Sequence, residues 1–287
     1  MKNAYIEITN VCNLSCSFCP GHDRARRHMS AEEFGTVLEK LRGKAGTVFL
    51  HLMGEPLLHP ELEELLRIAD GTEFTVKITT NGTLIEKTAD ILAAAKNLKT
   101  VCISLHSFEA NDKGDFEKYL TDCLDGAKKL AEAGKFAVLR LWNRGEGGKD
   151  SKNEEILSRI ESYFDSPRAL WVPNHRGERV VSRVFLEWGE KFEWPDEERA
   201  EECEPDGEAI PKICHGMLHQ IGILSDGTVV PCCLDRNGSI ALGNIFESSL
   251  SEVLDSPRAK RMRDAMAQRR AVEPLCRTCN FFRARKN

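Results

Sequence analysis

Three cysteines near the start of the chain have the residue type and spacing to hold a reactive metal centre. Cys12, Cys16 and Cys19 follow a short apolar run in a CxxxCxxC pattern. Three thiolates hold an iron-sulfur cluster and leave one of its irons open, whereas a structural zinc site takes four protein ligands. His22 and His28 are the only candidates for a fourth ligand close by in the sequence. The pattern favours a cluster with one open iron; a zinc knuckle and unligated core cysteines are the alternatives.

A second group of cysteines lies in the last third of the chain. Cys214 and Cys232 stand near the open ends of a predicted hairpin, which consists of two short apolar runs joined by an Asp-Gly turn. Because a hairpin brings its open ends together, these two thiols are expected to lie close to each other. Cys276 and Cys279 form a CxxC. These four thiolates could fully enclose a metal centre, either an iron-sulfur cluster or zinc.

The other cysteines are interpreted differently. Cys102 and Cys123 fall in an apparent strand and an apparent helix, so both are expected to be core residues. Cys203 could replace one of the four ligands, and Cys233 is expected to face away from Cys232 along the strand. Eleven cysteines in a chain without an apparent leader favour metal binding over disulfides, because a reducing cytosol keeps thiols free. The expected location is therefore cytoplasmic.

The overall charge gives no general attraction to nucleic acid or to an anionic membrane. The chain has 287 residues, 41% of them hydrophobic, and a net charge of −5. Its pI is near 6.0. The basic cluster of Arg24, Arg26 and Arg27 is expected to be a solvated face. No apolar run is long enough to span a bilayer, so a membrane is not an expected partner. Because the net charge is negative, a nucleic acid is not an expected partner either.

Alternating strand and helix patterns predict an α/β fold. Apolar strand patterns occur at 4–8, 47–52, 74–79, 100–106, 136–143 and 181–186. Helical patterns follow most of them, at about 31–41, 62–69, 85–95, 116–133 and 153–164. Five or six such units are too few for a regular eight-fold barrel, which predicts a partial (β/α)6 TIM-like barrel over 1–200. A small domain over 201–287 would contain the hairpin and a helix from about 250 to 266.

Polar residues gather at the ends of the predicted strands, where parallel α/β folds place their chemistry. Gly54-Glu55-Pro56 follows the second strand, and Asn81 begins a turn after the third. Alternation places Ser104 and His106 on one face of the fourth strand. His106 could carry a proton or contact substrate, or it could be a structural, hydrogen-bonded histidine. Arg140 is unfavourable in an apolar strand unless it meets an anion, either bound or in a barrel ion pair.

These motifs resemble those of the radical S-adenosylmethionine (radical SAM) enzymes, whose signature is CxxxCxΦC with an aromatic residue at Φ. Phe18 stands at that position. The resemblance implies that the three N-terminal cysteines hold a 4Fe-4S cluster whose open iron binds SAM. It implies SAM contacts for a further set of residues: Phe18, Gly54, Glu55, Pro56, Asn81, Ser104 and Arg140. Glu55 would bind the amino group and Arg140 the carboxylate of SAM. Met53 departs from the family's GGEP-like motif at its first glycine, and Leu105-His106-Ser107 departs from SxDG.

The second cysteine group resembles the SPASM/twitch extension found in some radical SAM enzymes. The order C…GxxxxC, LGNI, CxxC is reproduced by Cys214, Gly227 with Cys232, the run 242–245, and Cys276 with Cys279. The resemblance implies one auxiliary 4Fe-4S cluster of the shortened twitch kind, because the further cysteines of a full SPASM domain do not follow. Its ligands would be Cys214, Cys232, Cys276 and Cys279.

The resemblance also implies an activity. A radical SAM enzyme cleaves SAM reductively to a 5′-deoxyadenosyl radical, which takes hydrogen from a substrate; an electron donor such as flavodoxin or ferredoxin is expected. A fully ligated auxiliary cluster would accept the remaining electron, so the chain is expected to be an oxidoreductase or peptide maturase. Its substrate would be an unknown small molecule or a peptide. The alternatives are an RNA- or cofactor-modifying enzyme in which Arg24, Arg26 and Arg27 hold phosphate, and a non-catalytic iron-sulfur or zinc protein.

Overall fold

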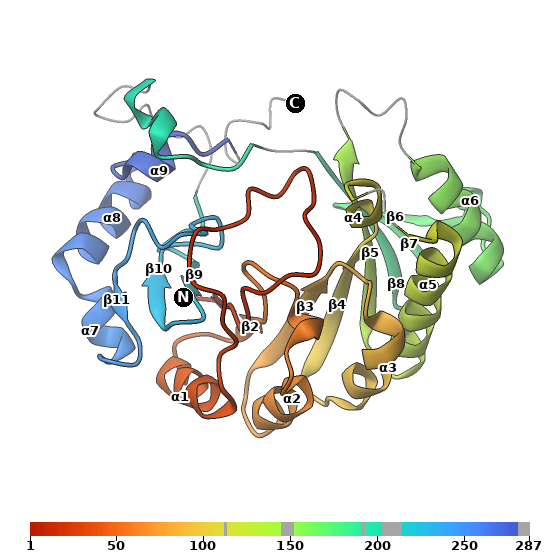
Figure 1. The fold of residues 1–287 in the computed structure, drawn as a ribbon, viewed down its shortest axis with the longest axis horizontal. Coiled ribbons are helices and arrows are strands. Elements are labelled where there is room, and N and C mark those ends of the chain that lie inside the picture. Colours follow the sequence, from red (N-terminus) through yellow and green to blue (C-terminus); the bar gives the residue numbers. More distant parts are fainter. Residues whose placement is uncertain (112–113, 145–151, 191–192, 203–213, 281–287) are drawn as a thin grey trace.

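The computed structural model describes residues 1–111, 114–144, 152–190, 193–202 and 214–280. The strands within these ranges are β1 (Asn3–Ile6), β2 (Thr47–Phe49), β3 (Thr75–Thr80), β4 (Leu98–Ser104), β5 (Phe136–Arg144), β6 (Val172–Asn174), β7 (Gly177–Val181), β8 (Val184–Glu190), β9 (Gln220–Ile223), β10 (Thr228–Val230) and β11 (Gly243–Asn244). They form one sheet in the order β11-β10-β9-β1-β2-β3-β4-β5-β8-β7-β6. Figure 1 shows that this sheet is curved and does not close on itself.

The helices within the described ranges are α1 (Ala31–Leu41), α2 (Leu62–Asp70), α3 (Ile85–Ala94), α4 (His106–Glu109), α5 (Phe116–Glu132), α6 (Asn153–Phe164), α7 (Leu250–Leu254), α8 (Pro257–Ala267) and α9 (Pro274–Arg277). The longer ones cover the convex side of the sheet, whereas the short helices α4 and α9 lie at the top of the molecule in Figure 1. Short 3-10 helices occur at η1 (Pro56–Leu58), η3 (Arg168–Leu170) and η4 (Glu198–Glu202). The predicted α/β fold with a partial barrel is confirmed. No helix within the described ranges is long and apolar enough to cross a membrane.

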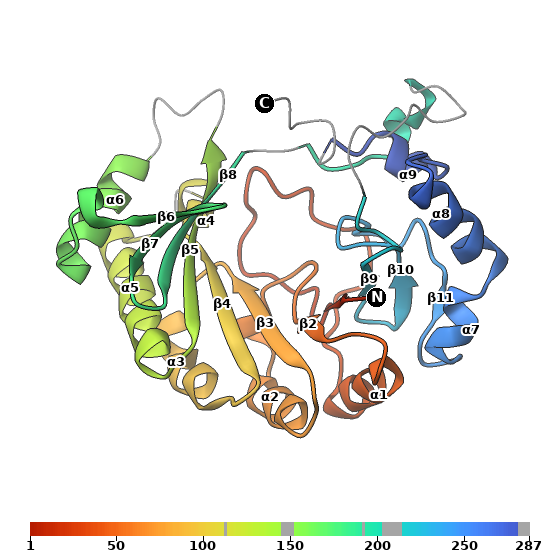
Figure 2. The ribbon, with the colours of Figure 1, turned by 180° about the vertical axis from the view of Figure 1, so that it is seen from behind.

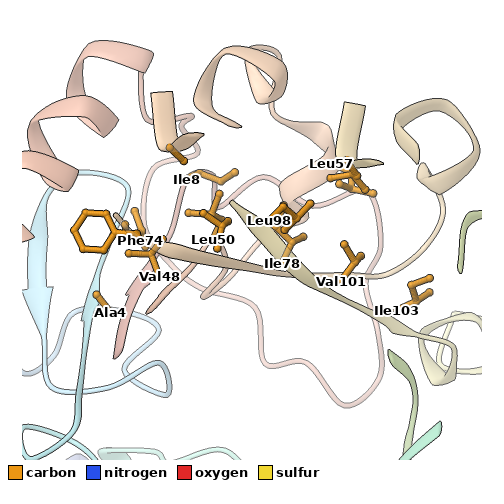
Figure 3. Packing of buried hydrophobic residues seen from close by; sticks show 14 of the residues in the cluster. Ala4, Ile8, Val48, Leu50, Leu57, Phe74, Ile78, Leu98, Val101 and Ile103 are labelled. Atoms are coloured by element: carbon orange, nitrogen blue, oxygen red, sulfur yellow. The ribbon is translucent and has the colours of Figure 1, made fainter. Parts of the chain in front are cut away.

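The core lies between the strands and the helices. β1 to β5 and β8 run parallel, so each contributes alternate residues to the helix-facing side. Val48, Ile78 and Val101 point to this side and are completely buried (Figure 3). Each such aliphatic side chain contributes about 1.5–3 kcal/mol on burial. The alternate residues face the concave side; Thr79 and Ser104 are only partly buried there, whereas Cys102 is buried.

Two predicted strands end differently in the structure. The predicted strand at 181–186 spans a turn at Arg183, whose φ of 64° breaks the strand. β7 therefore ends before this turn and β8 begins after it, and the two pair antiparallel. The predicted strand at 100–106 ends at Ser104, and His106 begins the short helix α4. The residue pattern of these two segments suits a strand and does not reveal the backbone dihedral angles at which the strand ends.

The C-terminal hairpin extends the barrel sheet. β9 pairs parallel with β1, from Asn3 opposite Gln220 to Ile6 opposite Ile223, and β10 pairs antiparallel with β9. Figure 2 shows the hairpin beside β1, with α7 and α8 beyond it. The predicted single helix over 250–266 is wrong, because it divides into α7 and α8. Pro257 has no N–H to continue a helix and instead starts α8, which Ser256 caps.

Candidate functional site: two cysteine centres on one sheet

The loop that carries the first three cysteines leaves the end of β1 and lies inside the curve of the sheet (Figure 1). Thr9 and His28 form an isolated antiparallel bridge that closes its base. Within the loop, the Asn10 side chain donates to the carbonyl of Ala25 at 2.9 Å and accepts from the amide of Arg27 at 2.8 Å. One amide side chain thus connects two distant parts of a long loop that has no helix of its own.

The three thiols of this loop remain accessible to a ligand. Cys12 and Cys19 are exposed, and Cys16 is half-buried. Asn111, which follows α4, donates to the sulfur of Cys16 at 3.1 Å and accepts from the amide of Ser15 at 2.9 Å. Partial burial raises the pKa of the Cys16 thiol, the Asn111 hydrogen bond lowers it, and the nearby Cys19 raises it again. Irons binding at these sulfurs would replace the protons.

Gly54 brings the turn after β2 against the cysteine loop. Its φ is +74°, and a Cβ there would lie 2.8 Å from the carbonyl carbon of Asn10 and closer still to the carbonyl oxygen of Thr9. The next amide, that of Glu55, donates to the carbonyl of Val11 at 2.9 Å. Only glycine allows this approach. Gly54 therefore makes the close contact, and the departure from the family motif at Met53 does not prevent it.

The carboxylate of Glu55 joins the ends of β2 and β3. It is buried and accepts from the Thr80 hydroxyl at 2.7 Å, from the Asn81 amide at 2.6 Å and from the Leu57 amide at 3.0 Å. Burial raises its pKa, and these hydrogen bonds partly offset the rise. A carboxylate offers about four acceptor positions, so Glu55 retains one for a ligand such as an ammonium group.

Asn81 connects the third strand end to the cysteine loop. Its side chain donates to the Asn13 side chain at 2.9 Å and accepts from the Thr83 amide at 3.0 Å. Asn13 in turn donates to the Thr83 hydroxyl at 2.8 Å. Pro56, the last residue of the predicted turn motif, is buried at the start of η1. The predicted contact residues at the ends of β2 and β3 thus lie together beside the cysteine loop.

Arg140 lies on the concave face next to Ser104, its neighbour on β4. Its guanidinium donates to the Thr79 hydroxyl at 3.1 Å and lies 3.5 Å from the Glu187 carboxylate. It also stands 4.8 Å from the ring of Trp142. The ion pair within the barrel, which the sequence left open, is formed in this structure.

Two buried polar atoms around this arginine, His51 Nδ1 and Trp142 Nε1, have no hydrogen-bond partner among the described residues, and Arg140 Nε has only its 3.5 Å ion contact with Glu187. Burial and the charge of Arg140 lower the pKa of His51 to about 3, so its ring is neutral. A buried polar atom left without a partner costs about 1–3 kcal/mol. A bound molecule with acceptor atoms, such as the carboxylate of SAM, would supply partners here, so the donors present fit that cofactor.

His106 bridges the cysteine loop and β5. Its ring lies 5.0 Å from that of the exposed Phe18, and its Nδ1 lies 3.1 Å from the carbonyl of Arg140. The amide of Trp142 lies 3.4 Å from the same nitrogen. His106 is thus buried against backbone while one face contacts the cluster loop.

The four C-terminal cysteines line a single pocket. They are Cys214, Cys232, Cys276 and Cys279. The other side chains that line the pocket are mainly apolar and include Ile240, Met262, Met266 and Leu275. Cys233 is not among the lining residues, and Cys203 lies outside the described residues. The two cysteines predicted to be core residues, Cys102 and Cys123, are buried.

The pocket favours thiols over thiolates when no cation is bound. Burial raises the pKa of Cys232 well above its usual value, and the neighbouring Cys233 and Cys276 raise it further. Burial likewise raises the pKa of Cys214 to about 11, although the Gly216 amide donates to its sulfur at 3.3 Å. Four thiolates that line one pocket suit a 4Fe-4S cluster, in which each sulfur ligates a different iron, so this donor set fits iron and sulfide.

The three arginines of the cysteine loop, Arg24, Arg26 and Arg27, do not form a free basic patch. Arg24 pairs with Glu7 at 2.6 Å, and Arg27 pairs with Glu33 at 2.6 Å. Arg26 is exposed. The predicted solvated face is therefore wrong for Arg24, which is largely buried. Sequence reasoning missed Glu7, although an acidic residue inside the apolar run before the first cysteine was an available indication.

Comparison with known proteins agrees with this arrangement. The radical SAM superfamily profile matches residues 6–143, and the SPASM iron-sulfur cluster-binding domain matches residues 214–280. A GTP 3′,8-cyclase of Chlorobaculum tepidum is 36% identical over 108 residues, 36% of this chain and 32% of that protein. The antilisterial bacteriocin subtilosin biosynthesis protein AlbA of Bacillus subtilis is 26% identical over 97% of this chain and 65% of its own length. The chain thus spans about a third of the GTP 3′,8-cyclase and about two thirds of AlbA.

Solved structures share the fold. BtrN in complex with AdoMet and 2-DOIA superposes with a TM-score of 0.55 at 19% identity, covering 98% of this chain and 93% of BtrN. Streptococcus suis SuiB bound to the precursor peptide SuiA gives a TM-score of 0.60 at 17% identity, covering 96% and 70%. With two matching family profiles at the positions of the two cysteine centres, the chain belongs to the radical SAM superfamily and carries a C-terminal SPASM iron-sulfur domain.

Proposed function

We propose that this protein oxidises a peptide substrate, using the C-terminal cysteine pocket as the site of an electron-accepting cluster. The main support for this proposal is that four cysteines from three segments line one largely apolar pocket. A cluster with four protein ligands has no open iron at which a substrate could bind. The pocket therefore suits electron transfer rather than substrate binding.

The first centre has the opposite design. When bound, SAM and the N-terminal cluster supply a 5′-deoxyadenosyl radical that takes a hydrogen atom from the substrate. Cys12, Cys16 and Cys19 would hold the cluster, and Glu55 would accept a hydrogen bond from the ammonium group of SAM. Arg140, whose Nε has only the 3.5 Å contact with Glu187, would bind the SAM carboxylate beside Ser104. This arrangement requires the Arg140–Glu187 contact to loosen or share its donor when SAM binds.

The electron count gives a net oxidation. The substrate would lose one hydrogen atom to the 5′-deoxyadenosyl radical, which becomes 5′-deoxyadenosine, and then one electron to the auxiliary cluster and one proton to a base or solvent. The product is therefore lighter by two hydrogen atoms, including where a new bond replaces two X–H bonds. An external donor such as flavodoxin or ferredoxin supplies the electron for each SAM cleavage.

Similarities in sequence and in structure both support a peptide substrate. AlbA, a bacteriocin biosynthesis protein, aligns over nearly the whole chain, and SuiB was solved with its precursor peptide. A small-molecule oxidation is the second candidate, because BtrN, solved with 2-DOIA, covers nearly the same length. The RNA- or cofactor-modifying alternative loses support, since Arg24 and Arg27 are engaged in ion pairs.

The test is turnover by anaerobically reconstituted protein with a reductant, SAM and peptides encoded beside its gene. The expected product is a peptide lighter by two hydrogen atoms. Cys279→Ala is expected to keep forming 5′-deoxyadenosine while peptide oxidation stops. Equal oxidation by Cys279→Ala would refute the electron-acceptor role. Oxidation of alcohols but of none of the peptides would replace the peptide reading with the small-molecule one.

A further inference from the structure

Glu7 is a fully buried carboxylate that the proposed reaction does not use. It follows β1 and none of its surface is exposed. A buried charge is unfavourable unless it is paired and hydrogen-bonded, so its partners must be specific. The partners come from three separate segments of the chain, and each of these segments leads to one of the two cysteine centres or to the SAM-binding turn.

Arg24 provides the charge that balances Glu7. Its Nη2 donates to Glu7 Oε2 at 2.6 Å, and its Nε donates to the carbonyl of Arg236 at 2.8 Å. The guanidinium therefore links the cysteine loop to a loop of the SPASM domain. Asp23 and Asn237 add two hydrogen bonds beside it, one at 3.1 Å and one at 2.9 Å.

The other contacts of Glu7 extend this link. Its Oε1 accepts from the amide of Ser225, at the turn of the β9–β10 hairpin, at 3.1 Å. Its Oε2 also accepts from the amide of Met53, just before Gly54, at 3.3 Å. One carboxylate thus contacts the cysteine loop, the turn at the SAM site and the SPASM hairpin.

The sequence positions show what this contact joins. Arg24 lies five residues after Cys19, and Arg236 lies four residues after Cys232. We propose that the Glu7–Arg24 ion pair is a positioning contact that fixes the separation of the radical SAM cluster and the auxiliary cluster. The inference requires both clusters, which the family provides, but it does not depend on the electron-acceptor role proposed above.

The chain offers a matched control in the same loop. Arg27 pairs with Glu33 at the same distance as Arg24 with Glu7, but the side chains of that pair are 34% and 31% exposed, against 13% and 0%. Glu33 belongs to α1 and not to the SPASM domain. Exposed pairs contribute little, typically below about 1 kcal/mol. Arg27→Gln therefore perturbs the loop without touching the link between the two centres.

The experiment measures the magnetic coupling between the two reduced clusters by pulsed EPR in the loaded protein. Glu7→Gln cannot accept from both Arg24 and Ser225 with its single carbonyl oxygen, so a weaker and broader coupling is expected. Hydrogen exchange of the peptide containing Ser225 should become roughly ten-fold faster or more, the factor for losing a hydrogen bond to a charged group. Arg27→Gln should match the wild type in both measurements.

Arg24→Lys keeps the test decisive if Glu7→Gln fails to hold both clusters. Lysine retains a positive charge beside Glu7. It cannot reproduce the guanidinium, in which two separate nitrogens donate to Glu7 and to the carbonyl of Arg236. Broadened coupling in Arg24→Lys would support the proposal. Coupling and exchange identical to the wild type in whichever of these variants keeps both clusters would overturn it. An equal disturbance in Arg27→Gln would also overturn it, because the effect would then belong to the loop as a whole.

Discussion

The two cysteine centres of this protein are built in opposite ways. The N-terminal thiols stand on an exposed loop held in shape by Asn10 and Asn111, within reach of the concave face. The C-terminal thiols line an apolar pocket behind the β9–β10 hairpin. An open centre leaves room for a ligand at one iron, whereas a closed one leaves none. The difference teaches that ligand number and surroundings, more than the cysteine itself, decide whether a centre is open to a ligand or closed.

The largest expected effect comes from removing one ligand of the open centre. Cys12→Ala should abolish SAM cleavage, because two thiolates would not hold the cluster that binds SAM. The measurement is 5′-deoxyadenosine formed under reducing, anaerobic conditions. Cys276→Ala is the counterpart in the closed centre and should retain cleavage. If both variants lose cleavage equally, the two centres are not functionally separate.

Gly54 tests the contact between the SAM-site turn and the open centre. Gly54→Ala places a Cβ against the Thr9 and Asn10 backbone at a φ that alanine rarely adopts. The turn must shift, and SAM cleavage should fall by about 100-fold, as expected for a misplacement near 1 Å. Gly35→Ala is the control, because a Cβ there meets open space on α1 and should leave cleavage unchanged. Normal cleavage by Gly54→Ala would remove the steric argument.

Metal analysis tests whether the closed centre holds a cluster. Reconstituted wild-type protein should contain about eight iron and eight sulfide per chain, the amount for two 4Fe-4S clusters. Cys279→Ala should lower both values toward about four, with the open centre intact. Four iron with one zinc in the wild type would instead make the pocket a structural zinc site, and the contrast between the centres would then lie in the metal.

A pH effect tests the neutral His51, whose Nδ1 is buried beside the open centre. Its folded-state pKa, about 3, is below its usual value, so the folded protein binds fewer protons than the unfolded chain between about pH 3 and 6.5. This contribution to stability is present above pH 6.5 and is lost as the pH falls toward 3. The slope is at most about 1.4 kcal/mol per pH unit. Denaturant unfolding at pH 7.5 and 5.5 should show a smaller difference for His51→Gln than for the wild type. If the difference in unfolding free energy between the two pH values is the same in His51→Gln as in the wild type, His51 is not the source of this pH dependence.

The smallest effect is expected at the exposed pair of the cysteine loop. Arg27→Gln should lower the unfolding free energy by less than about 1 kcal/mol, because both partners are about one third exposed. Denaturant unfolding measures this loss. A loss of several kcal/mol would show that the base of the open loop is more tightly coupled to α1 than its exposure indicates.

The sequence alone predicted most of what depends on local spacing. The CxxxCxxC triplet, the turn at Gly54 and Glu55 and the run of strand and helix patterns follow from residues close together in the chain. The order of the parallel strands then brought Asn81, Ser104 and Arg140 to the concave side. The boundaries at Arg183 and Pro257 were missed, since a left-handed residue and a helix break are easily hidden in a favourable pattern.

What only the tertiary structure decided are long-range pairings that no motif indicated. The contact of β9 with β1 and the ion pair of Glu7 with Arg24 are the examples. Residue spacing carries no information about such contacts, because they depend on how whole elements pack. The sequence therefore determined that the chain has two cysteine centres with an open and a closed ligand set. The fold decided that both stand on one sheet and that the buried carboxylate of Glu7 contacts segments from both regions, because its burial excludes water and it therefore requires partners from the protein.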